Sequence, residues 1–259
     1  MNNLRKKIEL KEKIRGSIVS LTDPGLCEII AASGFDCVWI DMEHTYIDCK
    51  ELYSHVLACK AEDVSVIVRV PQHDYDTLKR VLEMGVDGIV FPMPRNVAEA
   101  ADDIAHTLYP PLGVRGFGPR RAIRYGMDDV DTYLQERSLD ICRFVQLEHI
   151  KAIEELEEII KIPYIDGFIF GPCDLAGSIG QPGKHLGSDA TKIMTETTAY
   201  LKKNGKYCGL SIGDYSMESV RHWSEMGMDM ISAGADTDFL LAGARQAYEN
   251  LARVHLKAE

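Results

Sequence analysis

Two carboxylates in this sequence each follow a short apolar run. Glu148 comes directly after Val145-Gln146-Leu147, and Asp174 ends the stretch Phe170-Gly171-Pro172-Cys173-Asp174. A carboxylate inside the wall of a parallel sheet would be costly unless it met water or a cation, whereas the carboxyl end of a strand allows both. Two oxygen ligands, with the other positions left to water and substrate, are the usual way of holding Mg²⁺. The spacing therefore predicts a divalent-metal site at Glu148 and Asp174. The alternative is that both residues only cap the helices that follow them.

Further polar residues occupy the same kind of position, at or after the end of an apolar run. In chain order they are Asp41, Glu43 and His44 after residues 37–40, Arg69 after residues 65–68, and Gln146 beside Glu148. In a barrel of parallel strands the catalytic groups lie at the carboxyl ends of the strands. We therefore expect one mouth of the fold to gather this whole set.

His44 and Arg69 have the chemistry of a base and of an anion-binding group. Asp41 and Glu43 could orient the His44 imidazole and tune its pKa for general-base catalysis, although a plain loop histidine is the alternative. The planar Arg69 guanidinium suits a substrate carboxylate, and the alternative is a salt bridge to Glu148 or Asp41.

The turn at residues 171–174 brings the backbone N–H groups of Cys173 and Asp174 toward the same mouth, where they suit a carboxylate oxygen. Gln146, Cys173 and Asp174 are therefore expected to bind substrate together with Arg69. We reject Cys173 as a nucleophile, because nothing near it in the sequence marks its thiol as activated.

The order of the apolar runs predicts the fold. Eight expected strands alternate with helices, and no hairpin signal interrupts them; the strands are residues 17–20, 37–40, 65–68, 88–91, 142–146, 167–170, 207–211 and 228–233. This pattern predicts an α/β fold of the (β/α)8 TIM-barrel type, a single domain over residues 1–259. A doubly wound sheet is less favoured, because no Gly-rich nucleotide turn follows the first strand.

Two segments stand out from this alternation. A final helix is expected over residues 238–256, after the eighth strand, and a helix over residues 128–137 before the fifth. Residues 109–126, rich in Gly and Pro, are expected to form a long ordered loop, and loops of that length are often functional. Four arginines of this loop could hold a phosphate, but for at least two of them we favour pairing with acidic neighbours or another subunit: Arg115, Arg120, Arg121 and Arg124.

Composition narrows the class of partner. The net charge of −11 argues against nucleic acid or an anionic membrane as the main partner, while a local arginine still permits an anionic substrate. The seven scattered cysteines show no zinc-binding or CxxC spacing, so we expect reduced thiols. Without a signal peptide or an apolar run long enough for a membrane span, we expect a soluble cytoplasmic protein.

Several short motifs, in the same order, resemble the HpcH/HpaI family of metal-dependent pyruvate aldolases over nearly the whole chain from about Gly16. They are Gly34-Phe35-Asp36, Ile40-Asp41-Met42-Glu43-His44, Val68-Arg69-Val70-Pro71, Tyr109-Pro110-Pro111 with Gly113, Arg115-Gly116 and Gly118, Gln146-Leu147-Glu148, and Gly171-Pro172-Cys173-Asp174-Leu175.

The resemblance implies a class II aldolase on a (β/α)8 barrel. Glu148 and Asp174 would bind Mg²⁺, Mn²⁺ or Co²⁺, which pyruvate chelates through its carboxylate and keto oxygens. Arg69 would hold the pyruvate unit, and His44 would act as base. The family pairs this histidine with an acidic residue before a glycine, and here Glu83 stands where Asp is expected, ahead of Met84-Gly85. Members are commonly hexamers, trimers of dimers with an exchanged C-terminal helix and with sites bordered by neighbouring subunits.

The expected reaction is reversible cleavage of a 4-hydroxy-2-oxo acid to pyruvate and an aldehyde through a metal-bound enolate. A Lewis acid and a nearby cation would stabilise that enolate, and a Schiff-base mechanism is less favoured because no lysine follows these strand ends. Two alternatives remain, an oxaloacetate decarboxylase using the same enolate and a non-catalytic binding protein on the same barrel.

The aldehyde is left open by the sequence. Succinic semialdehyde, tartronate semialdehyde and lactaldehyde all fit. Its binding groups are expected in residues 117–124 and 211–215, in part from a neighbouring subunit, and Arg120 and Arg121 suggest an acidic aldehyde.

Overall fold

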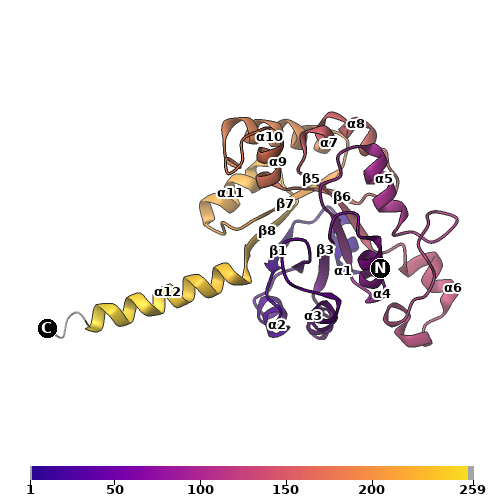
Figure 1. The fold of residues 1–259 in the computed structure, drawn as a ribbon, viewed down its shortest axis with the longest axis horizontal. Helices are drawn as coiled ribbons and strands as arrows, with labels where there is room; N and C mark the ends of the chain where they lie inside the picture. The colour runs from indigo at the N-terminus through magenta and orange to yellow at the C-terminus, as the bar shows by residue number, and fades with distance from the viewer. Residues whose placement is uncertain (1, 256–259) are drawn as a thin grey trace.

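The computed structural model describes residues 2–255 and contains one closed barrel of eight parallel strands (Figure 1). Each strand pairs with the next, and β8 pairs with β1 to close the barrel. The strands are β1 (Ile14–Val19), β2 (Cys37–Asp41), β3 (Ser65–Arg69), β4 (Gly88–Phe91), β5 (Cys142–Leu147), β6 (Gly167–Phe170), β7 (Tyr207–Ile212) and β8 (Met230–Ala235). The predicted (β/α)8 fold is confirmed.

Helices connect the strands and cover the outside of the barrel. They are α1 (Asn3–Glu9), α2 (Gly25–Ala32), α3 (Cys49–Ala61), α4 (Tyr75–Glu83), α5 (Val97–Ala105), α6 (Val130–Thr132), α7 (Ile150–Glu154), α8 (Leu156–Ile159), α9 (Pro172–Ser178), α10 (Ser188–Lys203), α11 (Met217–Met226) and α12 (Asp236–His255). A 3₁₀ segment, η1 (Arg121–Gly126), and a π-helical segment, η2 (Tyr133–Arg137), flank α6.

Some predicted boundaries were wrong. The first strand begins at Ile14 rather than residue 17, because residues 14–16 already pair with β8. The eighth strand is shifted two residues toward the C-terminus. The helix expected over residues 128–137 is split into α6 and η2, and the turn expected at residues 171–174 enters the short helix α9. The predicted final helix corresponds to α12, and its expected end at residue 256 lies outside the described residues.

Apolar side chains fill both the inside of the barrel and the space between the barrel and its helices. Every residue of β2, β4, β5 and β6 is buried, which explains why these strands read as continuous apolar runs rather than alternating ones. The barrel interior is filled by a cluster that includes Trp39, Ile67, Phe144 and Ile169, and Leu4 of α1 packs against the same cluster. α1 therefore covers one end of the barrel and leaves the other end, the mouth, for a site.

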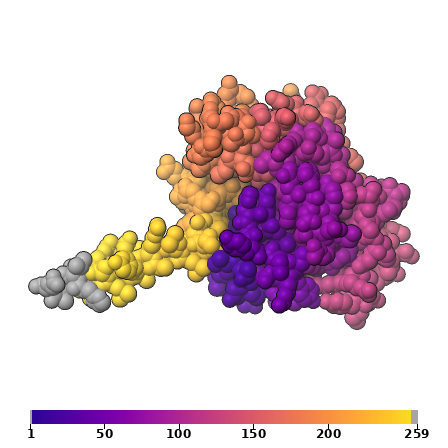
Figure 2. Space-filling view, in the orientation of Figure 1, coloured from indigo at the N-terminus to yellow at the C-terminus, as the bar shows by residue number. Residues whose placement is uncertain are grey.

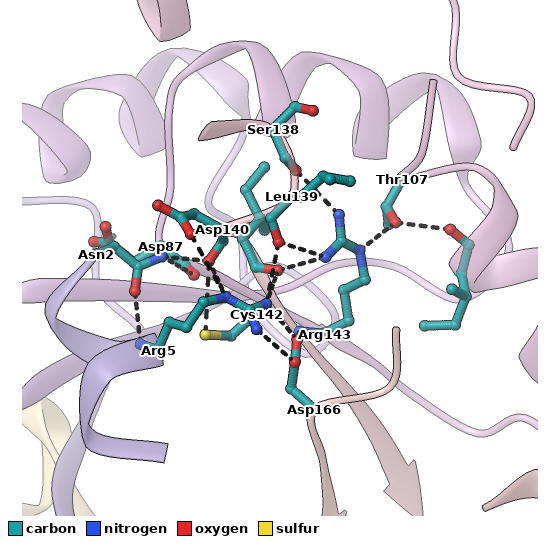
Figure 3. Close-up of polar contacts among 12 residues, drawn as sticks. Asn2, Arg5, Asp87, Thr107, Ser138, Leu139, Asp140, Cys142, Arg143 and Asp166 are labelled. Atoms are coloured by element: carbon teal, nitrogen blue, oxygen red, sulfur yellow. Dashed lines mark hydrogen bonds and ion pairs between the residues drawn. The ribbon is translucent and has the colours of Figure 1, made fainter. Parts of the chain in front are cut away.

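A network of polar side chains ties α1 to the covered end of the barrel (Figure 3). Arg5 donates to both carboxylate oxygens of Asp166, at 3.0 and 2.9 Å, and to backbone carbonyls of residues 139–141. The side chain of Arg143, fully buried on β5, donates to Thr107 Oγ1 and to the carbonyls of Ser138, Leu139 and Ile141. Burial lowers the pKa of Arg143 to about 10, so it remains a cation near neutral pH. These buried guanidinium groups are satisfied by oxygen acceptors at the end opposite the mouth.

The last helix does not cover the barrel. α12 leaves the end of β8 and projects away from the body as an arm (Figures 1 and 2). An apolar stripe at helical spacing runs along it, and every member is exposed: Leu240, Ala244, Ala247, Leu251 and Val254. Beside its base, a groove of about 570 Å³ is lined by residues of β1, β8, α11 and the end of α2, among them Ile14, Phe35 and Val220.

Within residues 2–255, no helix combines the length and the apolar character that crossing a membrane requires.

Candidate active site

The centre of the mouth is an ion pair between two neighbouring strands. Asp41 ends β2, Arg69 ends β3, and the two residues are partners in the strand register. Arg69 Nε and Nη2 donate to the two oxygens of Asp41 at 2.9 and 2.6 Å, and Arg69 Nη1 lies 3.1 Å from Glu43 Oε2. Burial favours a higher pKa for Asp41, but the hydrogen bonds and charge of Arg69 outweigh it and lower that pKa. Arg69 is thus a fixed cation at the base of the site.

The loop after β2 is organised by Asp41 and presents His44. The Asp41 Oδ1 atom accepts from the backbone N–H of Glu43 at 3.0 Å, and the Asp41 carbonyl accepts from the Thr45 hydroxyl. His44 Nε2 lies 3.6 Å from Glu43 Oε2, while the His44 side chain is 63% exposed. Asp41 therefore orients the loop, Glu43 contacts the imidazole, and His44 is accessible to solvent.

Glu148 is the most buried carboxylate of the site, at 1% exposure. Its Oε1 accepts from the backbone N–H of Met93 at 2.7 Å, and its Oε2 accepts from Gln146 Nε2 at 2.5 Å. Burial, followed by the negative charge of Glu43, raises the pKa of Glu148 to about 8. Burial likewise raises the pKa of Glu43 despite the nearby positive charge of Arg69. Without a cation, the site holds more negative charge than Arg69 offsets.

Asp174 lies in the first turn of α9. Gly171 is the N-cap and Pro172 begins the helix, a position where proline costs no hydrogen bond. The charge of Asp174 is among the causes that raise the pKa of both Glu148 and Glu43. The structure therefore brings the two predicted metal ligands and Glu43 into one electrostatic cluster.

The residues present fit a divalent cation. The donors are carboxylate oxygens, and one buried acceptor beside Glu148, Gln146 Oε1, lacks a hydrogen-bond partner. Within residues 2–255, no three or more His, Cys, Asp or Glu side chains are close enough together to hold a metal by themselves. A site of two carboxylates that leaves positions for water and substrate is the pattern typical of Mg²⁺.

Cys173 is exposed beside Asp174, and burial together with the charges of Asp174 and Glu148 raises the pKa of its thiol. A thiol with a raised pKa is a poor nucleophile. The structure thus agrees with the rejection of Cys173 as a nucleophile.

Glu83, expected to pair with His44, lies elsewhere in this chain. It ends α4, which runs from the mouth back to the start of β4, and its carboxylate contacts Arg115 at 2.9 Å and the Tyr109 hydroxyl at 3.5 Å. The structure therefore does not bring Glu83 to His44 within one chain, because the two residues lie at opposite ends of the barrel.

The long loop is also remote from the mouth of its own chain. Arg121 donates to the carbonyl of Met84, at the end of α4, and Arg124 pairs with Asp128. Arg115 and Arg124 thus have acidic partners, as expected for at least two of the four arginines. Residues 117–124 cannot border the site of their own chain. Residues 211–215 begin in β7 and continue past its carboxyl end, on the side of the mouth.

Two features of the site were not among the predicted site residues. Glu43 was expected only to orient His44 and tune its pKa. It also contacts Arg69, and its negative charge raises the pKa of Glu148. The Met93 backbone, between Pro92 and Pro94, binds Glu148 directly. The Pro-Met-Pro sequence at a strand end was the available signal for an unusual backbone there.

The barrel mouth gathers carboxylates around a fixed arginine, and comparison with known proteins identifies the family. The sequence profile described as HpcH/HpaI aldolase/citrate lyase matches residues 16–242, so the chain belongs to this family. It is an aldolase, a carbon–carbon lyase.

Individual relatives agree. The chain is 32% identical to a hydroxypyruvate/pyruvate aldolase of Deinococcus radiodurans, covering 89% of this chain and 82% of the relative. It is 28% identical to a 4-hydroxy-2-oxo-heptane-1,7-dioate aldolase of Shigella sonnei, covering 90% and 87%. A crystal structure of an HpcH/HpaI aldolase/citrate lyase family protein from Burkholderia cenocepacia superposes with a TM-score of 0.91 at 30% identity, covering 97% of this chain and 100% of that one.

The close approach of Glu148 to Gly171 gives a test of the site geometry. A Cβ at residue 171 would lie 2.2 Å from Glu148 Oε2 and 2.7 Å from Gln146 Nε2, so Gly171→Ala must displace both side chains. Because a shift of about 1 Å in a catalytic group can cost about a hundredfold in rate, we expect a loss of that order in aldol cleavage. The matched control is Gly177→Ala in the same helix, where a Cβ meets nothing within 4 Å. Equal activity of the two variants would contradict the described position of Glu148.

Proposed function

We propose that the protein is a divalent-metal-dependent aldolase that reversibly cleaves a 4-hydroxy-2-oxo acid into pyruvate and an aldehyde. The observation that carries this proposal is the pairing of an anion-rich cluster, the buried Glu148 with the half-buried Asp174 and Glu43, with the fixed cation Arg69 at one barrel mouth. Relatives named as pyruvate-type aldolases support the choice of substrate.

Glu148 and Asp174 would hold the cation, which we propose to be Mg²⁺, Mn²⁺ or Co²⁺. When bound, it would supply Lewis acidity toward the carboxylate and keto oxygens of the oxo acid. Gln146 keeps Glu148 in place through Oε2, and its own unpaired Oε1 faces a buried position where a water or substrate donor would satisfy it. The N–H groups of Cys173 and Asp174, in the first turn of α9, have no partner within the helix and are proposed to bind the substrate carboxylate.

Arg69 would stabilise the negative charge that develops on the former keto oxygen as the bond between carbons 3 and 4 breaks. Its guanidinium is already held by Asp41 and Glu43 before substrate arrives, so little reorganisation is needed during the reaction. Asp41 acts on the reaction through Arg69 and through the loop that carries His44.

His44 would remove the proton from the 4-hydroxyl group. As that proton leaves, the C4 oxygen forms the aldehyde carbonyl, the C3–C4 bond breaks, and its electron pair forms the pyruvate enolate. The His44 imidazolium, directly or through a water, then gives its proton to C3, which completes pyruvate and restores neutral His44, and the reverse sequence makes the carbon–carbon bond. Glu43, 3.6 Å from His44 Nε2, would stabilise the imidazolium in between.

We propose further that the active form is a homo-oligomer, a hexamer built as a trimer of dimers, in which α12 is exchanged between subunits. The exposed apolar stripe of α12 and the groove beside its base have complementary apolar character. An isolated helix that exposes such a stripe needs a partner for its stability. In that assembly, residues of another subunit, including its long loop, could border the mouth and contact the aldehyde.

The free thiols of all seven cysteines support a cytoplasmic location.

Metal removal tests the central step. Protein stripped with EDTA should release no pyruvate from 4-hydroxy-2-oxoheptanedioate, and Mg²⁺ or Mn²⁺ should restore release. Glu148→Gln keeps the shape of the side chain but removes its charge, so added metal should leave it about a thousandfold below the wild type, the effect of several kcal/mol of lost charge stabilisation. Full activity in EDTA would contradict the proposal. Pyruvate release from oxaloacetate alone, with no aldehyde-dependent reaction, would favour the decarboxylase instead.

Substitutions of Arg69 and of His44 should change different kinetic parameters. Arg69→Ala should raise the KM for pyruvate in the synthetic direction by about thirtyfold or more, because it leaves the bound pyruvate anion without its cationic partner. Arg69→Lys should recover part of that loss. His44→Ala should lower kcat by about 10²- to 10⁴-fold with little change in KM. The exposed His222 of α11 provides the control variant His222→Ala. Normal turnover of His44→Ala would exclude it as the base.

The proposed exchange of α12 predicts the molar mass of the assembly in solution. Wild-type protein should elute as a hexamer in size-exclusion chromatography with light scattering, whereas the double variant Leu240→Glu with Leu251→Glu should form smaller species. Gln246→Glu adds a charge on another face of α12 and should leave the mass unchanged. A wild-type monomer, or an unaltered mass in the double variant, would contradict the exchange.

A further inference from the structure

The backbone that binds Glu148 has an unusual conformation. Met93 has a φ of +54°, in the left-handed region that non-glycine residues seldom adopt and that costs about 1–2 kcal/mol. Met93 also precedes Pro94, and a residue before proline favours extended backbone instead. Something in the surrounding structure must therefore stabilise Met93 in this state.

Gln72 contacts this backbone from a neighbouring loop. It lies in the loop between β3 and α4, three residues after Arg69, and its Nε2 donates to the Met93 carbonyl at 3.1 Å. The N–H of the same residue donates to Glu148 Oε1 at 2.7 Å. Both polar groups of the Met93 backbone are thus used, the carbonyl toward Gln72 and the N–H toward Glu148.

The φ and ψ of Met93 set how its carbonyl lies relative to its N–H. If Met93 relaxed to an extended backbone, it could not keep the carbonyl on Gln72 and the N–H on Glu148 at the same time. Glu148 is almost fully buried, so its Oε1 would then lose its hydrogen-bond donor and its side chain would lose one of its two anchors. Outer contacts of this kind orient ligand side chains, and their loss typically lowers metal affinity by about 10- to 100-fold.

We infer that Gln72 is a positioning residue for Glu148, which acts by holding Met93 in its left-handed conformation so that the Met93 N–H fixes the carboxylate. The inference rests on the proposed role of Glu148 as a metal ligand. It connects three successive parts of the mouth, the loop after β3, the loop after β4 and the end of β5.

The test is a double-mutant cycle read out by Mn²⁺ binding to EDTA-stripped protein, measured by electron paramagnetic resonance without substrate. Gln72→Met removes the donor with little change in size and should weaken Mn²⁺ binding about tenfold. Met93→Gly keeps the N–H and adopts a positive φ at little cost, so it should bind Mn²⁺ nearly as the wild type does. In the Met93→Gly background, Gln72→Met should then have less than about a twofold effect.

Controls separate positioning from general damage. Gln181 is a second glutamine on the same side of the barrel, after α9, and its amide binds the exposed Asp189 rather than the site, so Gln181→Met should leave Mn²⁺ affinity unchanged. Gln72→Leu provides a second variant that also lacks the donor and adds no charge, for use if Gln72→Met folds poorly, and it should show the same loss.

Three results would overturn the inference. Wild-type Mn²⁺ affinity in the Gln72 variants, with binding lost in Glu148→Gln, would show that Gln72 does not position Glu148 and would leave the proposed metal site intact. An equal loss with and without Met93→Gly would show that Gln72 does not act through Met93. Unchanged affinity in Glu148→Gln would overturn the proposed metal site and this inference together.

Discussion

The site depends on keeping the Glu148 carboxylate charged in a place that excludes water. Burial and the neighbouring Glu43 both favour its protonated form, and the raised pKa of about 8 expresses that conflict. Two hydrogen-bond donors, the Met93 N–H and the Gln146 amide, stabilise the charged form of Glu148, and the nearby positive charge of Arg69 does so too. A divalent cation would complete the compensation. The structure around the mouth can be understood as what is needed to hold this one anion.

The opposite end of the barrel has the complementary arrangement. There Arg143 is buried among carbonyl oxygens and Arg5 joins α1 to Asp166, so cations are satisfied by backbone and carboxylate oxygens (Figure 3). Arg5 and Arg143 thus have structural partners at that end, whereas the mouth holds an unpaired acceptor, Gln146 Oε1, and carboxylates that repel one another. Barrel enzymes commonly divide stability and activity between their two ends in this way.

Much of this arrangement follows from local sequence. Parallel strands that are buried on both sides read as apolar runs, so the eight strands and the polar residues at their ends, such as Asp41, Arg69 and Glu148, could be located directly. The partner of Arg69 could not be chosen between Asp41 and Glu148, because that depends on strand register. Glu83 shows the limit more clearly. A motif places it in the chain, but only the direction of α4 reveals that it lies away from His44. Met93 depends on a contact from Gln72, twenty-one residues away in sequence, which no local pattern predicts.

A crystal structure with metal and pyruvate bound tests the proposed site most directly. Crystals soaked with Mn²⁺ and pyruvate should give an anomalous peak at the manganese edge about 2.2 Å from carboxylate oxygens of both Glu148 and Asp174, with pyruvate against Arg69. We expect this to be the strongest peak in each subunit. A peak elsewhere, or pyruvate bound beside Arg69 with no metal at these two carboxylates, would contradict the proposed metal site.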